Sequence, residues 1–280
     1  MLEEEHCTTF VPLSQYDWGF GDGGQLAWNP IVFSLFASFS ALAYWISLEL
    51  VLLAYCAFKQ HKTLYFSAIT ITALGIILQT TGYILSKLIS TSPQLTNLII
   101  TEIGWIGNVT GFSLVLYSRL HLVVRDPRIL KAVLAMITTN AVVFHTSTAV
   151  LEFALVISPL PSTFLPAALI FEPLQQTVFA TQESVIAILY IYHTARFLRS
   201  GYTSHKTRRG IIALISMQLF VIALDGILTG FFYAGWLVVK CMLHPFFYAL
   251  KLRLEFVVLN QLKGLCDGGV VVVVDEQSVR

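Results

Sequence analysis

The sequence predicts an all-α integral membrane protein that folds as a bundle of seven transmembrane helices. Apolar residues make up 56% of the 280-residue chain, charged residues make up only 12%, and the mean hydropathy is +0.75. A soluble domain carries about 25% charged residues, so this chain lacks the charge needed to cover a water-facing surface. The composition therefore excludes a soluble globular enzyme, a disordered chain, a collagen and a nucleic-acid-binding protein.

Seven windows are long and apolar enough to cross a bilayer, which takes about 20 residues in a helix. They are Ile31–Phe58, Leu64–Ile89, Leu98–Tyr117, Ile129–Ile157, Pro173–Ala195, Gly210–Phe232 and Gly235–Leu259. The start of the fifth is ambiguous, since Pro166 and Pro173 both suit a first helical position. Polar and charged residues interrupt the seventh. We expect an N-terminal lumenal segment over residues 1–30, one bundle over 31–262, and a cytosolic tail over 263–280.

The distribution of basic residues predicts the orientation of the bundle. Eleven Lys and Arg residues fall in the connections after the first, third and fifth spans, whereas Lys87 is alone on the opposite side. Because cytoplasmic loops are enriched in Lys and Arg, the N-terminus is predicted to be lumenal or extracellular and the C-terminus cytosolic. The acidic start MLEEEH is not followed by the apolar core of a cleavable signal peptide. We expect a multi-pass protein of the endoplasmic reticulum.

Acidic residues inside the apolar windows are the candidate functional residues. An ionisable side chain in the bilayer core costs about 2.5–3.5 kcal/mol on insertion scales and is a functional candidate by default. The predicted catalytic candidates are Glu102, Glu152, Asp225, Glu172 and Glu183. In the predicted orientation the first four fall in the lumenal half of the membrane, and the fifth falls near its middle.

Three neighbouring spans each carry a polar face at the helical repeat of about 100° per residue. These faces consist of Glu172, Gln176, Phe179 and Glu183 on the fifth span, His145 and Glu152 on the fourth, and Gln218 and Asp225 on the sixth. A bundle turns such faces inward, so we expect one polar chamber that opens toward the lumen. The residues predicted to line its substrate pocket are His145, Gln176, Gln218 and Trp105.

A carboxyl group in such a chamber has a specific chemical use. Apolar surroundings favour the neutral acid over the carboxylate, and a neutral carboxylic acid can protonate an apolar substrate. The 20 Phe, 11 Tyr and 5 Trp residues are compatible with a pocket that stabilises cations. The four cysteines are far apart, without the spacing of a metal site, so the sequence predicts neither a metal nor another cofactor.

The same residues allow two other interpretations. Buried Glu, Gln and His side chains on membrane helices often only hydrogen-bond a neighbouring helix. A non-catalytic seven-span sensor or transporter could instead use the chamber to bind or move a solute. For the four acids at one depth, we favour a shared site over structural hydrogen bonding alone.

Two stretches of the chain carry a resemblance to a known family. They are Thr110–Val124, with the sequence TGFSLVLYSRLHLVV, and Lys251–Leu262, with the sequence KLRLEFVVLNQL. Together they resemble a family of fungal seven-span integral membrane proteins, most of unknown function, over about residues 30–262. Some fungal seven-span proteins are membrane-bound terpene cyclases of meroterpenoid secondary metabolism, including the ascofuranone and ascochlorin type, and this chain is similar to them in size and topology.

The resemblance implies a metal-independent cyclisation of a lipophilic small molecule. In that reaction a carboxylic acid protonates a terminal epoxide or olefin of a prenylated aromatic, a cation develops, and an internal nucleophile or proton loss ends the reaction. The expected partners are this substrate and the lipid bilayer, without nucleic acid. The hypothesis from the sequence is therefore a membrane-bound terpene cyclase, with the sensor or transporter as its rival.

Overall fold

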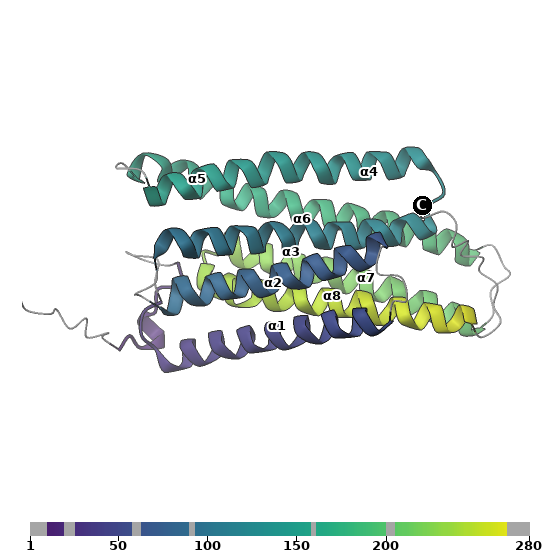
Figure 1. The fold of residues 1–280 in the computed structure, drawn as a ribbon, viewed down its shortest axis with the longest axis horizontal. Coiled ribbons are helices and arrows are strands. Elements are labelled where there is room, and N and C mark those ends of the chain that lie inside the picture. Colours follow the sequence, from purple (N-terminus) through teal and green to yellow (C-terminus); the bar gives the residue numbers. More distant parts are fainter. Residues whose placement is uncertain are drawn as a thin grey trace, which may run out of the picture.

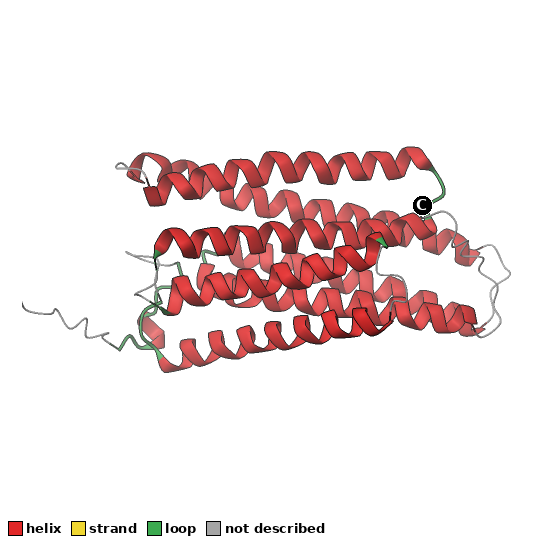
Figure 2. Ribbon diagram, in the orientation of Figure 1, coloured by secondary structure: helices red, strands yellow, loops and turns green. Residues whose placement is uncertain are grey.

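The computed structural model describes residues 10–19, 26–57, 63–89, 93–157, 161–199 and 205–267, and these residues form an all-α protein. The long helices are α1 (Pro30–Ala57), α2 (Leu64–Leu88), α3 (Gln94–Val123), α4 (Pro127–Asn140), α5 (Thr146–Ile157), α6 (Pro161–Arg199), α7 (His205–Tyr233) and α8 (Leu237–Asp267). A short 3-10 helix, η1 (Leu13–Gln15), precedes them. Within the described ranges there is no strand (Figure 2).

The helices run up and down as one elongated bundle (Figure 1). Helix α1 packs against α2 and α8, α2 packs against α3, and α6 and α7 continue the bundle back to α8. Helices α4 and α5 form one rod, joined by the π-helical turn η2 (Ala141–His145), and this rod contacts α3 and α6. In Figure 1 this rod lies on one flank of the bundle and α1 on the opposite flank.

The helix boundaries differ from the predicted windows by several residues at α3 and α7, and by the most at the start of α6 and the end of α8. Helix α6 begins at Pro161, so that Pro166 and Pro173 both lie inside it and neither is its first residue. Prolines are tolerated inside membrane helices, which is why a proline by itself did not mark the start of this one. Helix α8 continues to Asp267, past the predicted end of the bundle at residue 262, while the predicted tail beyond Asp267 lies outside the described residues.

Several of these helices fit a multi-pass membrane protein by their length and composition. Within the described residues, five segments are long and apolar enough to cross a bilayer: Pro30–Ala57, Leu64–Leu88, Gln94–Val123, Pro127–Ile157 and Ile212–Tyr233. Large apolar side chains are exposed on the outside of the bundle, such as Trp45 and Leu52, each 68% exposed. Such surfaces on the outside of long helices fit a lipid bilayer as the surrounding medium.

Helices α2 and α3 make the closest contact of the bundle because glycines line it. A Cβ atom added to Gly104 would lie 2.7 Å from the Cα of Gln79, and one added to Gly82 would lie 2.7 Å from the backbone nitrogen of Thr101. Both distances are far below a van der Waals contact. Small residues allow membrane helices to approach at their backbones, so these glycines set the spacing of α2 and α3.

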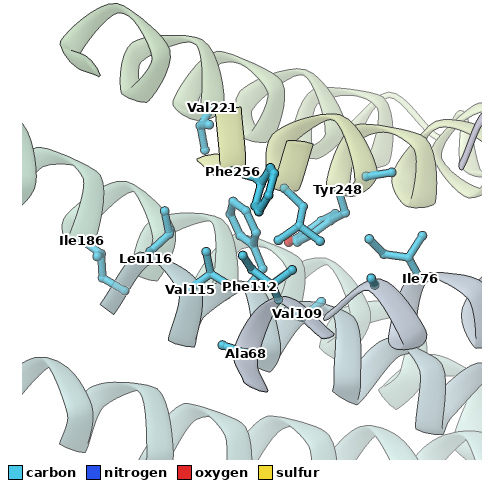
Figure 3. Packing of buried hydrophobic residues seen from close by; sticks show 14 of the residues in the cluster. Ala68, Ile76, Val109, Phe112, Val115, Leu116, Ile186, Val221, Tyr248 and Phe256 are labelled. Carbon is cyan, nitrogen blue, oxygen red and sulfur yellow. The ribbon is translucent and has the colours of Figure 1, made fainter. Parts of the chain in front are cut away.

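Apolar side chains fill the interior around this pair. The main cluster draws on α1, α2, α3, α4, α6, α7 and α8. Figure 3 shows its centre, where Val109, Phe112 and Val115 of α3 face Tyr248 and Phe256 of α8. The rings of Phe112 and Tyr248 meet edge to face with centroids 5.6 Å apart. This apolar core encloses the polar groups that form the candidate site.

The described part of the N-terminal segment closes one end of the bundle. Asn29 is buried and caps α1, since its side-chain oxygen accepts a hydrogen bond from the backbone nitrogen of Ile31 at 2.9 Å. Its side-chain nitrogen donates to the carbonyl of Val11 at 2.8 Å. The backbone nitrogen of Val238, at the start of α8, donates to the carbonyl of Trp18 at 3.0 Å. One side chain thus ties the N-terminal segment to the first turn of α1.

Replacing Asn29 by alanine is expected to lower the free energy of unfolding by about 1–2 kcal/mol. The substitution removes the cap and leaves the carbonyl of Val11 without the Asn29 donor. Thermal unfolding in detergent micelles measures the change. The control is Asp126→Ala, which removes the exposed cap of α4 and should cost less. Equal losses in both variants would contradict the role assigned to Asn29.

Candidate functional site

A small recess lies between α5 and α6. It is lined by Thr148, Leu151, Glu152, Ala168, Phe171, Glu172 and Gln175. The Thr148 hydroxyl donates a hydrogen bond to the side-chain oxygen of Gln175 across it. Its volume is about that of one water molecule. The recess therefore brings two acidic side chains from neighbouring helices to one small polar space.

The two acids of the recess interact with a third carboxyl group and an ammonium group nearby, and we call these four side chains the recess cluster. Its members are Glu102 of α3, Glu152 of α5, Glu172 of α6 and Lys240 of α8, which interact electrostatically with one another. Lys240 pairs with Glu172 at 3.3 Å and also lies 4.5 Å from the ring centroid of Phe232. One carboxyl oxygen of Glu102 is buried without a hydrogen-bond partner in the described structure.

Aromatic rings pack beside the recess cluster. Trp105 lies one helical turn from Glu102 on α3, and its ring meets that of His145 with centroids 4.5 Å apart. His145 in turn stacks on Phe179 of α6 at 5.2 Å. Phe144 lies 5.6 Å from Phe171, which lines the recess. The faces of such rings attract cations, so a positive charge that forms near the recess would be stabilised from this side.

His145 holds a special backbone position. It is the last residue of the π-helical turn η2, and π-turns inside α-helices are frequent at functional sites. Its Nε2 atom lies 2.7 Å from the Thr110 hydroxyl, while its Nδ1 atom is buried without a partner in the described part of the chain. The ring is therefore anchored on one side only, and its second nitrogen is free to bind a polar group.

A second group of charges lies deeper in the bundle, and we call it the lysine cluster. Lys251 of α8 pairs with Glu183 of α6 at 3.0 Å and with Asp225 of α7. Tyr248 donates a hydrogen bond to the other oxygen of Glu183 at 2.8 Å. The four side chains, Lys251, Glu183, Asp225 and Tyr248, are all buried. A charge without a partner is very costly in such surroundings, so these groups hold α6, α7 and α8 in one arrangement.

A third group, the arginine cluster, lies nearer the other end of α3. Arg119 pairs with Glu255 of α8 and donates a hydrogen bond to the Tyr190 hydroxyl of α6 at 3.3 Å. Gln218 of α7 donates to Glu255 at 2.7 Å. The Arg119 and Glu255 side chains are 2% and 0% exposed. The interior of the bundle thus carries three polar clusters along its length.

The structure divides the predicted site residues among these clusters. Glu152 and Glu172 line the recess and interact electrostatically with Glu102, while Trp105, one turn from Glu102, packs against His145. Asp225 and Glu183 lie in the lysine cluster, and Gln218 lies in the arginine cluster. Gln176 is buried on α6. The expectation of one chamber that includes Asp225 is therefore corrected to separate clusters, because buried Lys251 attracts the Asp225 carboxylate.

The sequence reasoning missed the cationic partners of these acids. Arg119 was counted among the basic residues of the connection after the third span, but it is buried inside α3, which continues to Val123. Lys240 and Lys251, and the acid Glu255, were given no role in the site, because charges in a weak apolar window suggest the end of a span rather than its core. A signal was nevertheless present in α8. Lys240, His244, Lys251 and Glu255 follow one another at intervals of four, seven and four residues, which places them on one face of a helix. All four are buried.

No described group of three or more His, Cys, Asp and Glu side chains is arranged to hold a metal ion. The recess cluster and the lysine cluster each include an ammonium group among their carboxyl groups. The chemistry that these residues offer by themselves is proton transfer and the stabilisation of charge. Proton transfer and the stabilisation of charge are therefore the two functions considered for this site.

The chain was also compared with known proteins. Residues 30–269 match the family described as a domain of unknown function, DUF7703. No curated protein and no solved structure matches the chain. The matched region begins at the first residue of α1 and ends just past α8, so it covers the helical bundle and the recess, lysine and arginine clusters of its interior. The chain belongs to the DUF7703 family.

Proposed function

We propose that this protein is a membrane-bound terpene cyclase of fungal secondary metabolism, which cyclises a prenylated aromatic or its terminal epoxide by proton transfer. One observation carries the proposal: the carboxyl groups of Glu152 and Glu172 line one recess beside a cluster of aromatic rings, and the carboxyl group of Glu102 on a third helix lies near enough to interact with both. The resemblance of the sequence to fungal seven-span proteins supplies the substrate class.

The proposal includes seven spans in the endoplasmic reticulum, with the N-terminus in the lumen. Five segments meet the composition of a span, whereas α6 and α8 carry more charged and polar residues. Many of these residues, including Glu183, Lys251 and Glu255, are buried and pair with other helices. Because such side chains do not face lipid, they lower the mean hydropathy of α6 and α8 without preventing either helix from crossing the bilayer.

The reaction assigns each group of the site a task. A neutral carboxylic acid gives its proton to the epoxide oxygen, the bond from that oxygen to the substituted carbon breaks, and a cation forms on the carbon. The π electrons of a nearby double bond, or an internal hydroxyl, attack this carbon and close the ring. A proton then leaves the product and returns to the carboxylate. The rings of Trp105 and Phe179 would stabilise the cation while it exists.

Two of the three acids suit the role of proton donor. Glu172 is already paired with Lys240 at 3.3 Å, so one of its carboxyl oxygens is engaged. Glu152 lines the recess, and Glu102 has an oxygen without a partner in the described structure. We therefore propose Glu102 or Glu152 as the acid, with Glu172 and Lys240 fixing the charge around it.

A prenylated substrate requires more room than the recess has, so the proposal includes an opening step. The rod of α4 and α5 is the least enclosed of the five apolar segments, with 11% of its apolar window buried. Its π-helical turn η2 lies where a bend would move α5 away from α6. Such a motion would open the recess sideways toward the bilayer, from which a lipophilic substrate enters.

Microsomes that contain the protein test the proposal with a prenylated phenol epoxide as the substrate. We expect the wild type to form a cyclised product, and Glu102→Gln or Glu152→Gln to lower its rate by about 10²–10⁴-fold, since general acid catalysis contributes that much. The control is Glu49→Gln, which removes the partly exposed partner of Arg253 and should leave the rate unchanged. If the wild type converts the substrate and both glutamine variants keep its rate, neither glutamate is the acid.

The buried lysine cluster favours a second candidate, a sensor or transporter. Ionisable residues inside membrane helices often mark the path of an ion or proton, and Lys251, Asp225 and Glu183 are fully enclosed in the bundle. If microsomes show no turnover of prenylated epoxides but bind or move a solute, and Asp225→Asn abolishes this, the second candidate replaces the cyclase.

A further inference from the structure

The lysine cluster contains one more carboxyl group than ammonium groups among the described residues. Asp225 and Glu183 can supply two negative charges, and Lys251 supplies one positive charge. Both carboxyl groups bind the same Lys251 nitrogen, Glu183 at 3.0 Å and Asp225 as a second close ion pair, so the two acids lie next to each other. Two adjacent carboxylates repel each other strongly away from water, and such pairs retain one proton between them.

The surrounding groups do not supply the missing positive charge. The nearest guanidinium on α3, that of Arg119, is already paired with Glu255. The α3 side chain that packs against Lys251 is Phe112, which is uncharged. Its ring centroid is 5.2 Å from the Lys251 nitrogen. On α8, the Tyr248 hydroxyl donates a hydrogen bond to Glu183 and adds no charge.

His244 is the remaining titratable group near the cluster, since its ring stacks on that of Tyr248 at 4.7 Å. Its Nδ1 atom lies 3.4 Å from the side-chain nitrogen of Gln79. The oxygen of that amide accepts from Asn108 at 2.8 Å, so the Gln79 NH₂ group faces His244. An NH₂ group is a donor, which requires Nδ1 to be an acceptor and the imidazole to be neutral.

One oxygen of Asp225 has no hydrogen-bond donor among the described residues, as expected if a positive charge is missing there. Its Oδ2 atom is buried and has no donor among the described residues, while Oδ1 accepts from Lys251. The side chain as a whole is 2% exposed. A proton on one of the two carboxyl groups would turn their contact into a hydrogen bond and remove the excess charge.

We propose that Asp225 and Glu183 form a proton-binding site, in which one proton is shared between the two carboxyl groups beside Lys251. The proton links α6 to α7, while Lys251 links both to α8. Loss of the proton would leave two carboxylates facing one ammonium and would weaken the contact between α6 and α7. The site does not depend on the cyclisation, because Glu183 lies eleven residues from Glu172 on α6, about 16 Å along the helix axis.

Infrared spectroscopy of the purified protein in lipid nanodiscs tests the proposal at neutral pH. A protonated carboxyl group has a C=O stretching band that a carboxylate lacks, and difference spectra between wild type and variant report one group at a time. We expect Glu183→Gln and Asp225→Asn each to lose the band of one carboxylic acid, because the remaining carboxylate is neutralised by Lys251. Lys251→Met should gain one such band, since both carboxyl groups would then bind a proton.

Two controls separate this result from its alternatives. Glu49→Gln removes a glutamate that is paired with Arg253 at 2.9 Å, so it should lose no carboxylic acid band. Thermal unfolding of each variant shows that the bundle is folded when its spectrum is recorded. If Glu183→Gln and Asp225→Asn both keep the wild-type band, the shared proton does not exist. If the band is absent from the wild type and Na⁺ raises its unfolding temperature, the site holds a metal cation and the proposal fails.

Discussion

Replacing Arg119 by methionine is expected to lower the free energy of unfolding by about 3–5 kcal/mol, the cost of breaking one buried ion pair. The Glu255 side chain is 0% exposed and would lose the guanidinium that balances its charge, whether it then stays ionised at a high cost or takes up a proton. The variant also loses the hydrogen bond to Tyr190 and the contact of the guanidinium with that ring, 5.0 Å from its centroid. Unfolding in detergent micelles, followed by circular dichroism, measures the loss.

Two further variants identify the cause of this loss. Arg253→Met removes an ion pair with Glu49 whose side chains are 41% and 30% exposed, and exposed pairs contribute about 0–1 kcal/mol. In the double variant Arg119→Met/Glu255→Gln the uncompensated charge is gone, while Gln218 can still bind the new amide. We expect the double variant to be more stable than Arg119→Met alone. If it is less stable, the lost contacts of Arg119 matter more than the charge of Glu255.

The second large effect is expected at the contact of α2 and α3. Gly104→Val should destabilise the bundle by about 3 kcal/mol or more, at the upper end of the range for overpacking, because the new side chain would overlap the backbone of Gln79. Backbone cannot move aside as a flexible side chain can, so the helices must separate. The same motion would break the hydrogen bond from Asn108 to Gln79 at 2.8 Å.

The matched control for this substitution is Gly230→Ala on α7. Nothing lies within 4 Å of a Cβ atom added at Gly230, and alanine is favoured over glycine inside a helix by about 0.5–1 kcal/mol. This variant should be as stable as the wild type or slightly more stable in the same unfolding measurement. A loss of stability at Gly230 equal to that at Gly104 would show that close packing of α2 and α3 is not the cause.

The all-α class and most helices follow from the apolar pattern of the sequence. Twenty or more apolar residues in a row leave the backbone only its own hydrogen bonds in lipid, which requires a helix. The pattern failed at the ends of two helices. Pro173 looked like a start and lies inside α6, and α8 extends to Asp267. Proline and scattered charges weaken a hydropathy signal without ending a helix whose neighbours satisfy them.

The candidate site could be predicted only in part. Counting residues from the ends of the spans gives a depth, and depth correctly grouped Glu102, Glu152 and Glu172 near one end of the bundle. The same count placed Asp225 with them, although it pairs with Lys251 and Glu183. Depth and helical phase describe one helix at a time, so neither indicates which opposite charge on another helix lies within reach.

The sequence by itself indicated a lipid bilayer as the surroundings of this protein and α-helix as the secondary structure that a bilayer permits. Both depend on composition and on local periodicity. It also indicated that the helices now labelled α3, α5, α6 and α7 carry acidic residues within their apolar windows, but not that α8 carries charges into the interior. The tertiary structure alone decided how those charges pair: Lys251 meets carboxyl groups that lie 26 and 68 residues away in the chain. Ion pairs depend on distances of a few ångströms, and packing of whole helices sets such distances.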